Sequence, residues 1–175
     1  AVGRGSARFD FQKLESLNGH YIRQADNDRL TELVMERLEN TLDGKLAEGA
    51  AARVKMGMNG LKERAKNLKE LAENAIFYAI SRPLQPDEKA SQILTDEAKR
   101  TLTAFRADVA ELDEWTEENI QTAAKAYAES HELKLGKVAQ PLRAALTGTT
   151  VSPGIFEVMA VLGRDESLAR LDDVH

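Results

Sequence analysis

The sequence predicts an all-α fold made of two packed helical subdomains. Apolar residues recur with roughly the 3.6-residue period of a helix between the Gly, Pro and Asn residues that punctuate the chain, and no stretch keeps the alternation of a half-buried strand. Pro83 and Pro86 interrupt the helical pattern, because a proline supplies no amide donor and biases the preceding residue away from helix. We therefore expect one subdomain over residues 1–85 and another over residues 86–175.

The first two helices are expected from their caps and apolar stripes. Asp10 can cap the first helix, whose apolar residues continue toward Ile22. Asn27 opens the second, with an apolar stripe along one face. Gly44 stops that helix, because glycine readily adopts the left-handed conformation found at helix ends.

The next two helices carry opposite local signals. The third is expected over residues 46–65, and Gly57 and Gly60 weaken it because glycine has a low helix propensity. The fourth is expected to begin at Asn67, since Glu70 stands three positions later, as a capping box requires.

Five further helices are expected in the second half. Four are opened by Thr95, Thr116, Ser152 and Asp165, and the remaining one runs from Val138 to Leu146 after a break at Gly136. Thr95 and Thr116 are each followed by two acidic residues, which favour the positive end of a helix dipole. Ser152 precedes Pro153, and a cap residue before a proline is typical of a helix start.

The charge balance bounds the partners that the chain can have. Lys plus Arg total 24 against 29 for Asp plus Glu, which gives a net charge of −5. An acidic protein is a poor candidate for nonspecific coating of nucleic acid, because phosphate neutralisation supplies most of that affinity. A local basic face on an acidic body can still bind a phosphate backbone, so the distribution of charge matters more than its sum.

Composition also points to a compartment. Cysteine is absent, which removes disulfides, thiolate metal sites and cysteine nucleophiles and favours the reducing cytoplasm. No run approaches the roughly 20 apolar residues of a membrane span, so we expect no membrane partner. The chain begins with Ala1 rather than Met, which suggests a processed protein or a piece of a larger one.

Catalytic and metal-binding patterns are not visible in the sequence. His20, His131 and His175 are far apart, and no second histidine follows His131 at the spacing of a helical zinc site. The glycines of residues 57–60 lie in a helical pattern rather than after a strand, which argues against a phosphate loop. The sequence predicts no catalytic residue, no metal ligand and no cofactor in this chain.

Residues 137–157 form the first unusual segment, combining a short proline-bearing helix, a Thr/Gly loop and a helix start. Composition favours a plain connector between helices. The alternative is a pocket for a polar planar group such as an unpaired nucleobase. In that case Arg143 offers a rigid donor fork and the start at Ser152 and Pro153 offers unpaired amide groups.

A basic run over residues 53–69 is the second unusual segment. It can be a solvated helix face with intrahelical pairs such as Glu63 with Lys66. Its excess charge is nevertheless positive, which also suits a phosphate backbone. Arg64 comes just before the Asn67 cap, and an arginine at a helix junction reaches base edges better than one in mid-helix.

The sequence KLGKVAQPLRAALTG at residues 134–148, followed by SPGIFE at 152–157, closely resembles the C-terminal end of bacterial glutamyl-tRNA synthetases, which are class I aminoacyl-tRNA synthetases. Residues 9–23 and 64–70 agree with that family in order and position. The resemblance covers essentially the whole chain. It implies a helical anticodon-binding region, with a stem-contact remnant and the first anticodon-binding subdomain before the predicted boundary and the second subdomain after it.

The family's catalytic domain has a Rossmann-type sheet with two ATP-binding signatures, and neither signature occurs here. The resemblance therefore implies a chain that binds tRNA but does not activate glutamate by itself. ATP and Mg are implied for the parent enzyme only, which is expected to be monomeric. The implied partner is tRNA(Glu), with tRNA(Gln) left open, and neither DNA nor a membrane is expected as a partner.

The same resemblance assigns roles to individual side chains. Arg64 matches the family position associated with reading the third anticodon base and with favouring tRNA(Glu) over tRNA(Gln). The pocket for the first anticodon bases is implied at Arg143, Ser152, Pro153 and Ile155. In that pocket Ile155 would supply an apolar wall against which a base can pack.

Four lysines are candidates for contacts to the phosphate backbone, namely Lys62, Lys66, Lys69 and Lys137. We also expect Arg64 and Arg143 to face the same concave side of the helical body. Two other interpretations remain open from the residues themselves. One is a helical protein-interaction bundle without RNA specificity, and the other is an intact catalyst with an unrecognised site.

Overall fold

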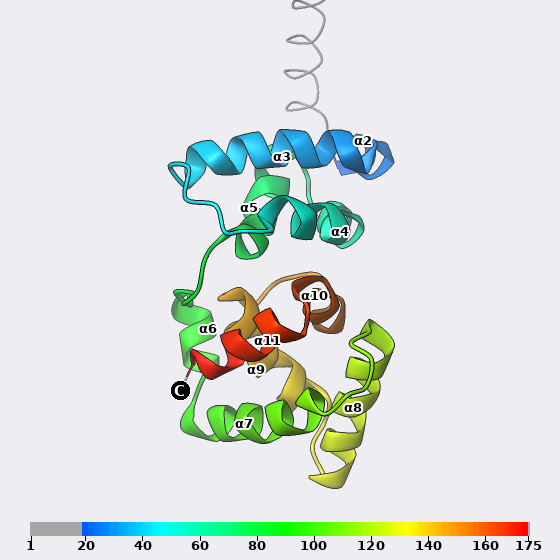
Figure 1. The fold of residues 1–175 in the computed structure, drawn as a ribbon, viewed down its shortest axis with the longest axis vertical. Helices are drawn as coiled ribbons and strands as arrows, with labels where there is room; N and C mark the ends of the chain where they lie inside the picture. Colours follow the sequence, from blue (N-terminus) through cyan, green and yellow to red (C-terminus); the bar gives the residue numbers. More distant parts are fainter. Residues whose placement is uncertain (1–18, 175) are drawn as a thin grey trace, which may run out of the picture. The chain divides into compact units, whose positions relative to one another are not determined.

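A computed structural model of the chain describes residues 19–174, and every regular element in that range is a helix (Figure 1). The all-α prediction is therefore confirmed. The chain divides into two compact units, one ending at Ile80 and the other beginning at Ser81. The helix expected after Asp10 falls mainly on residues outside the described range. None of the described helices is long and apolar enough to cross a bilayer.

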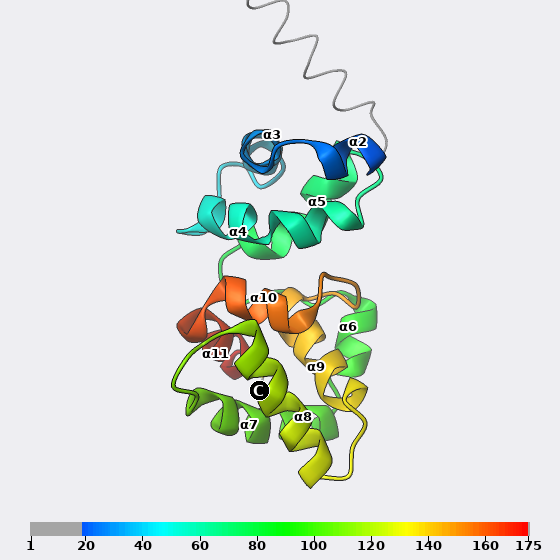
Figure 2. The ribbon, with the colours of Figure 1, turned by 90° about the vertical axis from the view of Figure 1, so that its right-hand side faces the viewer.

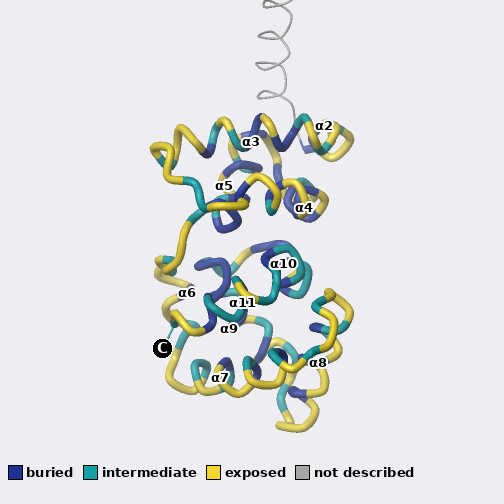
Figure 3. The backbone as a smooth tube through the Cα atoms, viewed as in Figure 1, coloured by how far each residue is buried: buried dark blue, intermediate teal, exposed yellow. Residues whose placement is uncertain are grey.

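The first unit is built from four helices, α2 (Gly19–Gln24), α3 (Asn27–Thr41), α4 (Ala50–Glu63) and α5 (Leu68–Ala79). Helices α3, α4 and α5 pack against one another in pairs, and α2 packs on α4 (Figure 2). Each of the three longer helices buries one apolar stripe, which includes Leu30 on α3, Met58 on α4 and Leu71 on α5. The dark stretches in Figure 3 mark these inward faces.

Local capping chemistry sets the helix starts in the first unit. Asn67 caps α5 as predicted, because its side-chain oxygen accepts a hydrogen bond from the amide of Glu70 at 2.8 Å. The Glu70 carboxylate accepts from the amide of Lys66 at 3.1 Å. Helix α3 begins at Asn27 as expected, but its cap is Asp26, whose carboxylate accepts from the amide of Arg29 at 3.2 Å.

The second unit contains α6 (Glu88–Ile93), α7 (Asp96–Ala110), α8 (Glu117–Ser130), α9 (Gly136–Thr147), α10 (Ile155–Leu162) and α11 (Arg164–Asp172). Helix α9 is the centre of this unit, since α6, α7, α8, α10 and α11 all contact it. Its central position explains why most of its side chains, Pro141 included, are buried. The predicted caps Thr95 and Thr116 are confirmed, because their hydroxyls accept from backbone amides at 3.2 and 3.1 Å.

One local prediction about the second unit was wrong, and one short helix was not predicted. Helix α10 begins at Ile155 after Gly154, so Ser152 is not its cap. The reason is that the Ser152 hydroxyl donates to the Pro153 carbonyl at 2.7 Å and accepts from Arg143 Nε at 2.9 Å, and α10 has no side-chain cap. The short helix α6 was not predicted, although Asp87 caps it by accepting from the amide of Ala90 at 2.8 Å.

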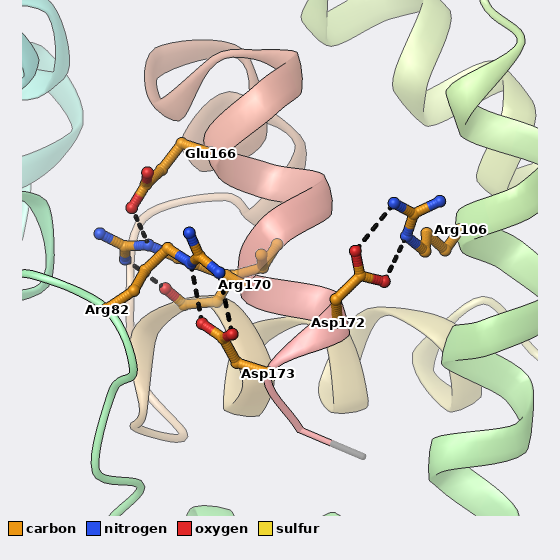
Figure 4. Close-up of polar contacts among 7 residues, drawn as sticks. Arg82, Arg106, Glu166, Arg170, Asp172 and Asp173 are labelled. Atoms are coloured by element: carbon orange, nitrogen blue, oxygen red, sulfur yellow. Dashed lines mark hydrogen bonds and ion pairs between the residues drawn. The ribbon is translucent and has the colours of Figure 1, made fainter.

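Ion pairs hold the end of α11 in place (Figure 4). Arg82 makes a two-pronged contact with Asp173, with N···O distances of 2.8 and 2.9 Å. The pKa of Arg82 is raised above its ordinary value, chiefly by this hydrogen bond. Arg106 of α7 binds Asp172 at 2.6 Å. The segment that follows Ile80 is thereby attached to the second unit.

Candidate nucleic-acid interface

Arg143 and Ser152 meet in the second unit. Arg143 lies on α9, and its Nε donates a hydrogen bond to Ser152 Oγ at 2.9 Å. The Ser152 hydroxyl in turn donates to the Pro153 carbonyl, so it is used as acceptor and donor at once. A guanidinium held at Nε keeps its planar donor fork in one orientation, which is what bidentate recognition of a base edge requires.

A chain of threonine hydroxyls shapes the loop between α9 and α10. Thr147 Oγ1 donates to the Arg143 carbonyl at 2.7 Å and accepts from the amide of Thr149 at 3.2 Å. Thr149 Oγ1 donates to the Val151 carbonyl at 2.8 Å. The sequence did not predict these contacts, although two threonines on either side of Gly148 are the signal that could have indicated them.

Gly148 ends α9 with a φ of 74°, a left-handed conformation that glycine adopts without steric cost. Its carbonyl accepts from the amide of Asp87 at 2.9 Å. A Cβ at this position would lie 3.4 Å from the Gln85 carbonyl oxygen. The loop is therefore held at its first residue by the segment that leads into α6.

Pro153 and Ile155, the apolar residues of the predicted pocket, are buried beneath the loop between α9 and α10. Ile155 is only 2% exposed, and Pro153 is also buried. Ile155 therefore packs into the core of the unit and presents little open surface to a base. Val151 is the apolar side chain that the loop exposes, with 69% of its surface accessible.

Arg64 occupies the C-terminal cap position of α4, at the junction predicted from the sequence. Its side chain is exposed and makes no hydrogen bond or ion pair within residues 19–174. Only two residues separate it from the Asn67 cap of α5. Arg64 thus lies at the surface between α4 and α5, and its guanidinium donors make no hydrogen bond within residues 19–174.

The lysines of the basic run differ in how they are used. Lys62 Nζ donates to Asn27 Oδ1 at 2.7 Å and to the Ala25 carbonyl at 3.3 Å, so it first serves to attach α4 to the start of α3. Lys69 lies 4.0 Å from Glu73, and both side chains are largely exposed. Lys66 is exposed, and its ammonium has no partner in the described part of the chain.

Lys137, the fourth phosphate candidate, lies at the start of α9 and is exposed. It borders a cavity of about 420 Å³ together with residues of α6 and α7. Among residues 19–174 no group of three or more His, Asp or Glu side chains gathers to hold a metal ion.

The structure thus brings together Arg143, Ser152 and Pro153 in one unit, and Arg64, Lys66 and Lys69 at neighbouring positions of the other. The prediction that Arg64 and Arg143 face the same concave side stays a prediction, because they belong to different units.

The described helices thus present an oriented arginine beside the loop between α9 and α10 in one unit and an arginine at a helix junction in the other. A family described as "Anticodon binding domain" matches residues 22–175, and the chain belongs to this family.

Its similar proteins include two named "Glutamate--tRNA ligase 2". The one from Paramagnetospirillum magneticum is 53% identical over 174 residues, covering 99% of this chain and 36% of that protein. The one from Zymomonas mobilis is 54% identical over 173 residues, covering 99% and 36%. The chain therefore spans about a third of the length of these relatives.

A solved structure of a glutamate tRNA ligase from Elizabethkingia meningosepticum resembles the chain with a TM-score of 0.71 and 24% sequence identity. The similarity covers 90% of this chain and 30% of that one. It supports the all-helical fold described above.

Proposed function

We propose that the chain is the anticodon-binding part of a glutamate–tRNA ligase and that it selects tRNA(Glu) through its anticodon loop. Its membership of the anticodon binding domain family supports a tRNA partner. The names of its relatives support glutamate as the amino acid that the whole enzyme attaches. The observation that carries the proposal is the Arg143–Ser152 contact, because it orients a guanidinium beside the loop that exposes Val151.

In the second unit, Arg143 is proposed to read the edge of one of the first anticodon bases. Unpaired bases expose hydrogen-bonding edges and flat faces, and a planar guanidinium can donate two parallel hydrogen bonds to such an edge. Ser152 holds Arg143 in position, and Pro153 and Ile155 support the loop from the core. The exposed Val151 supplies the apolar surface that was expected of Ile155.

In the first unit, Arg64 is proposed to read the third anticodon base and to favour tRNA(Glu) over tRNA(Gln). Its donors make no contact within residues 19–174, so an incoming base would not have to break an existing ion pair. Lys66, Lys69 and Lys137 are the proposed contacts to phosphate. Lys62 ranks below them, since its ammonium already binds Asn27 and Ala25.

The rest of the enzyme completes the proposal. We assign ATP and Mg to the catalytic part of the parent enzyme and no cofactor to this chain. We also propose that the parent acts as a monomer in the cytoplasm, with tRNA(Gln) as a competing substrate that Arg64 disfavours.

A titration with fluorescent anticodon stem-loops tests the proposal. We expect the chain to bind the glutamate-specific loop more tightly than a loop of the same length with a scrambled anticodon. Equal affinity for the two loops would favour the helical protein-interaction bundle. The measurement should be repeated at several salt concentrations, because phosphate contacts make RNA affinity strongly dependent on salt.

Arg64→Ala should lower discrimination at the third anticodon position by roughly tenfold, about 1.4 kcal/mol, because it removes a base-reading fork.

Lys69→Ala should weaken binding to all stem-loops about alike and reduce the salt slope, because a phosphate contact carries no sequence information. Stem-loops that differ only in the third anticodon base measure both effects. Equal loss of discrimination in the two variants would contradict these assigned roles.

Ser152→Ala should weaken binding of the glutamate-specific loop by about 1 kcal/mol, because the Arg143 guanidinium loses the acceptor that orients it. Thr103→Ala is a suitable control, since Thr103 is an exposed hydroxyl residue on α7 of the same unit. Titration of both variants, with a melting curve for each, separates lost recognition from lost stability. An unchanged affinity in Ser152→Ala would show that Arg143 needs no such support.

A further inference from the structure

Helix α2 lies directly against the end of α4 that carries Arg64. A Cβ added to Gly19 would lie 2.6 Å from the carbonyl oxygen of Ala65, which is closer than side-chain atoms approach backbone. The two helices can approach this closely only because residue 19 has no side chain. The next residues on either side of Ala65 are Arg64 and Lys66.

The Arg23 guanidinium also lies close to Gly19. Its Nη1 lies 2.9 Å from the point that a Cβ of Gly19 would occupy, so the guanidinium runs back over Gly19 toward Ala65. Arg23 is one helical turn after Gly19, which places both residues on one face of α2. The missing side chain at Gly19 therefore leaves the space in which Arg23 lies.

Three exposed cations belong to this junction: Arg23, whose Nη1 lies beside Gly19, and Arg64 and Lys66, which flank Ala65 in the chain. None of their side chains has a hydrogen-bond or ion-pair partner in the part of the chain that the structure describes. Lys55 of the same unit differs from them, since it pairs with Asp28 at 3.0 Å. Like charges repel when they are close, so such a cluster costs free energy unless an anion binds to it.

We propose that Arg23 is a further RNA-binding residue of this chain and that it contacts the phosphate next to the base read by Arg64. The inference rests on the proposed function. It adds helix α2 to the RNA-binding surface and gives Gly19 the role of a positioning residue. Lys66, on the other side of Ala65, completes a set of cations that can follow the backbone while Arg64 reads the base.

The chemistry distinguishes the two arginines. A phosphate contact needs positive charge within reach, and lysine can replace arginine there as a point charge. A base edge needs the two-pronged guanidinium, which lysine cannot reproduce. Arg23→Lys should therefore retain binding and salt dependence, whereas Arg64→Lys should lose discrimination at the third anticodon base.

The test measures the affinity of the whole chain for the glutamate-specific stem-loop between 50 and 200 mM salt, a range over which phosphate contacts change affinity strongly. We expect Arg23→Gln to weaken binding about fivefold near 0.1 M salt and to make the slope of log K against log salt shallower by about 0.7 to 0.9. The ratio of affinities for stem-loops that differ in the third anticodon base should not change.

Lys45→Gln is the matched control. Lys45 is exposed, has no side-chain partner within residues 19–174, and lies in the loop after α3, at the end of that helix far from α2 (Figure 1). It removes the same charge from the same unit, so any effect of net charge alone appears in both variants. We expect its salt slope to equal that of the unmodified chain.

The possible outcomes separate the two proposals. If the unmodified chain does not prefer the glutamate-specific loop, the proposed function fails and this inference fails with it. If the unmodified chain shows that preference but Arg23→Gln behaves like Lys45→Gln, only the role of Arg23 is overturned. Melting curves of both variants should coincide, because neither side chain has a hydrogen-bond or ion-pair partner within residues 19–174.

Discussion

Arg170→Ala should lower the free energy of unfolding of the second unit by ~3–5 kcal/mol, the range typical of breaking a buried ion pair. Arg170 is a charged residue of α11 that is only 1% exposed. Its Nε donates to Glu166 Oε1 at 2.9 Å, and its Nη1 donates to the Leu146 carbonyl on α9 at 2.7 Å (Figure 4).

The size of this effect follows from what the variant leaves behind. Removing the guanidinium takes the Nε hydrogen bond from the partly buried Glu166 carboxylate and a donor from the carbonyl of the buried Leu146. The lost side chain also leaves a cavity between α9 and α11. Each of these changes costs free energy in the folded state and none in the unfolded state.

Trp115 gives a selective readout, because it is the single tryptophan of the chain and belongs to the second unit. Its Nε1 donates to the Met159 carbonyl at 2.8 Å, so its fluorescence depends on the packing of α10. Denaturant unfolding followed by this fluorescence measures the effect. Arg100→Ala, which removes an exposed arginine on α7, should change stability by less than about 0.5 kcal/mol. A similar small change in Arg170→Ala would contradict the structural role of Arg170.

Gly57→Ala should destabilise the first unit by about 2 kcal/mol, within the range typical of overpacking a core. Helix propensity alone predicts the opposite, since alanine is favoured over glycine by about 1 kcal/mol in a helix interior. A Cβ at residue 57 would lie 2.6 Å from one ring carbon of Tyr78 and 2.9 Å from another. Tyr78 is fully buried and cannot move its ring aside at low cost.

Denaturant unfolding followed by circular dichroism at a helical wavelength measures the stability of the first unit. The unfolding transition followed by Trp115 fluorescence, which reports on the second unit, should stay unchanged. Gly136→Ala is the control, because a Cβ at that helical position meets no atom within 4 Å. We expect it to be neutral or slightly stabilising. Replacing the Tyr78 ring with the smaller leucine side chain in a Gly57→Ala background should recover part of the lost free energy of unfolding. A double-mutant cycle measures this recovery. Stabilisation by Gly57→Ala would mean that propensity outweighs the contact.

Helix starts were predicted well where the signal is local. Thr95, Thr116 and Asn67 each cap the helix expected of them, because a cap depends on a hydrogen bond between residues three apart. The structure places Arg64 at a helix junction and Arg143 beside a Thr/Gly loop, as the sequence indicated, while their roles at the anticodon stay predictions.

Residues whose role depends on distant segments were misread or missed. Ser152 had the pattern of a helix cap, yet it binds Arg143 and Pro153 instead. The Lys62 ammonium binds Asn27, which is 35 positions away along the chain, and the sequence did not indicate this contact; its predicted role at phosphate stays a prediction. Nothing in the local pattern of α11 indicated that Arg170 is buried, because a charged residue on an amphipathic helix is ordinarily exposed.

The period of apolar residues and the chemistry of caps were enough to predict an all-helical chain and most of its helix starts, because both act within one or two helical turns. The packing of the helices decides instead which polar groups form hydrogen bonds or ion pairs inside the protein. Gly57 illustrates the difference: within α4 it only weakens a helix, but against Tyr78 of α5 it is what lets the two helices pack. Packing joins residues far apart in the chain, and no local pattern records that proximity.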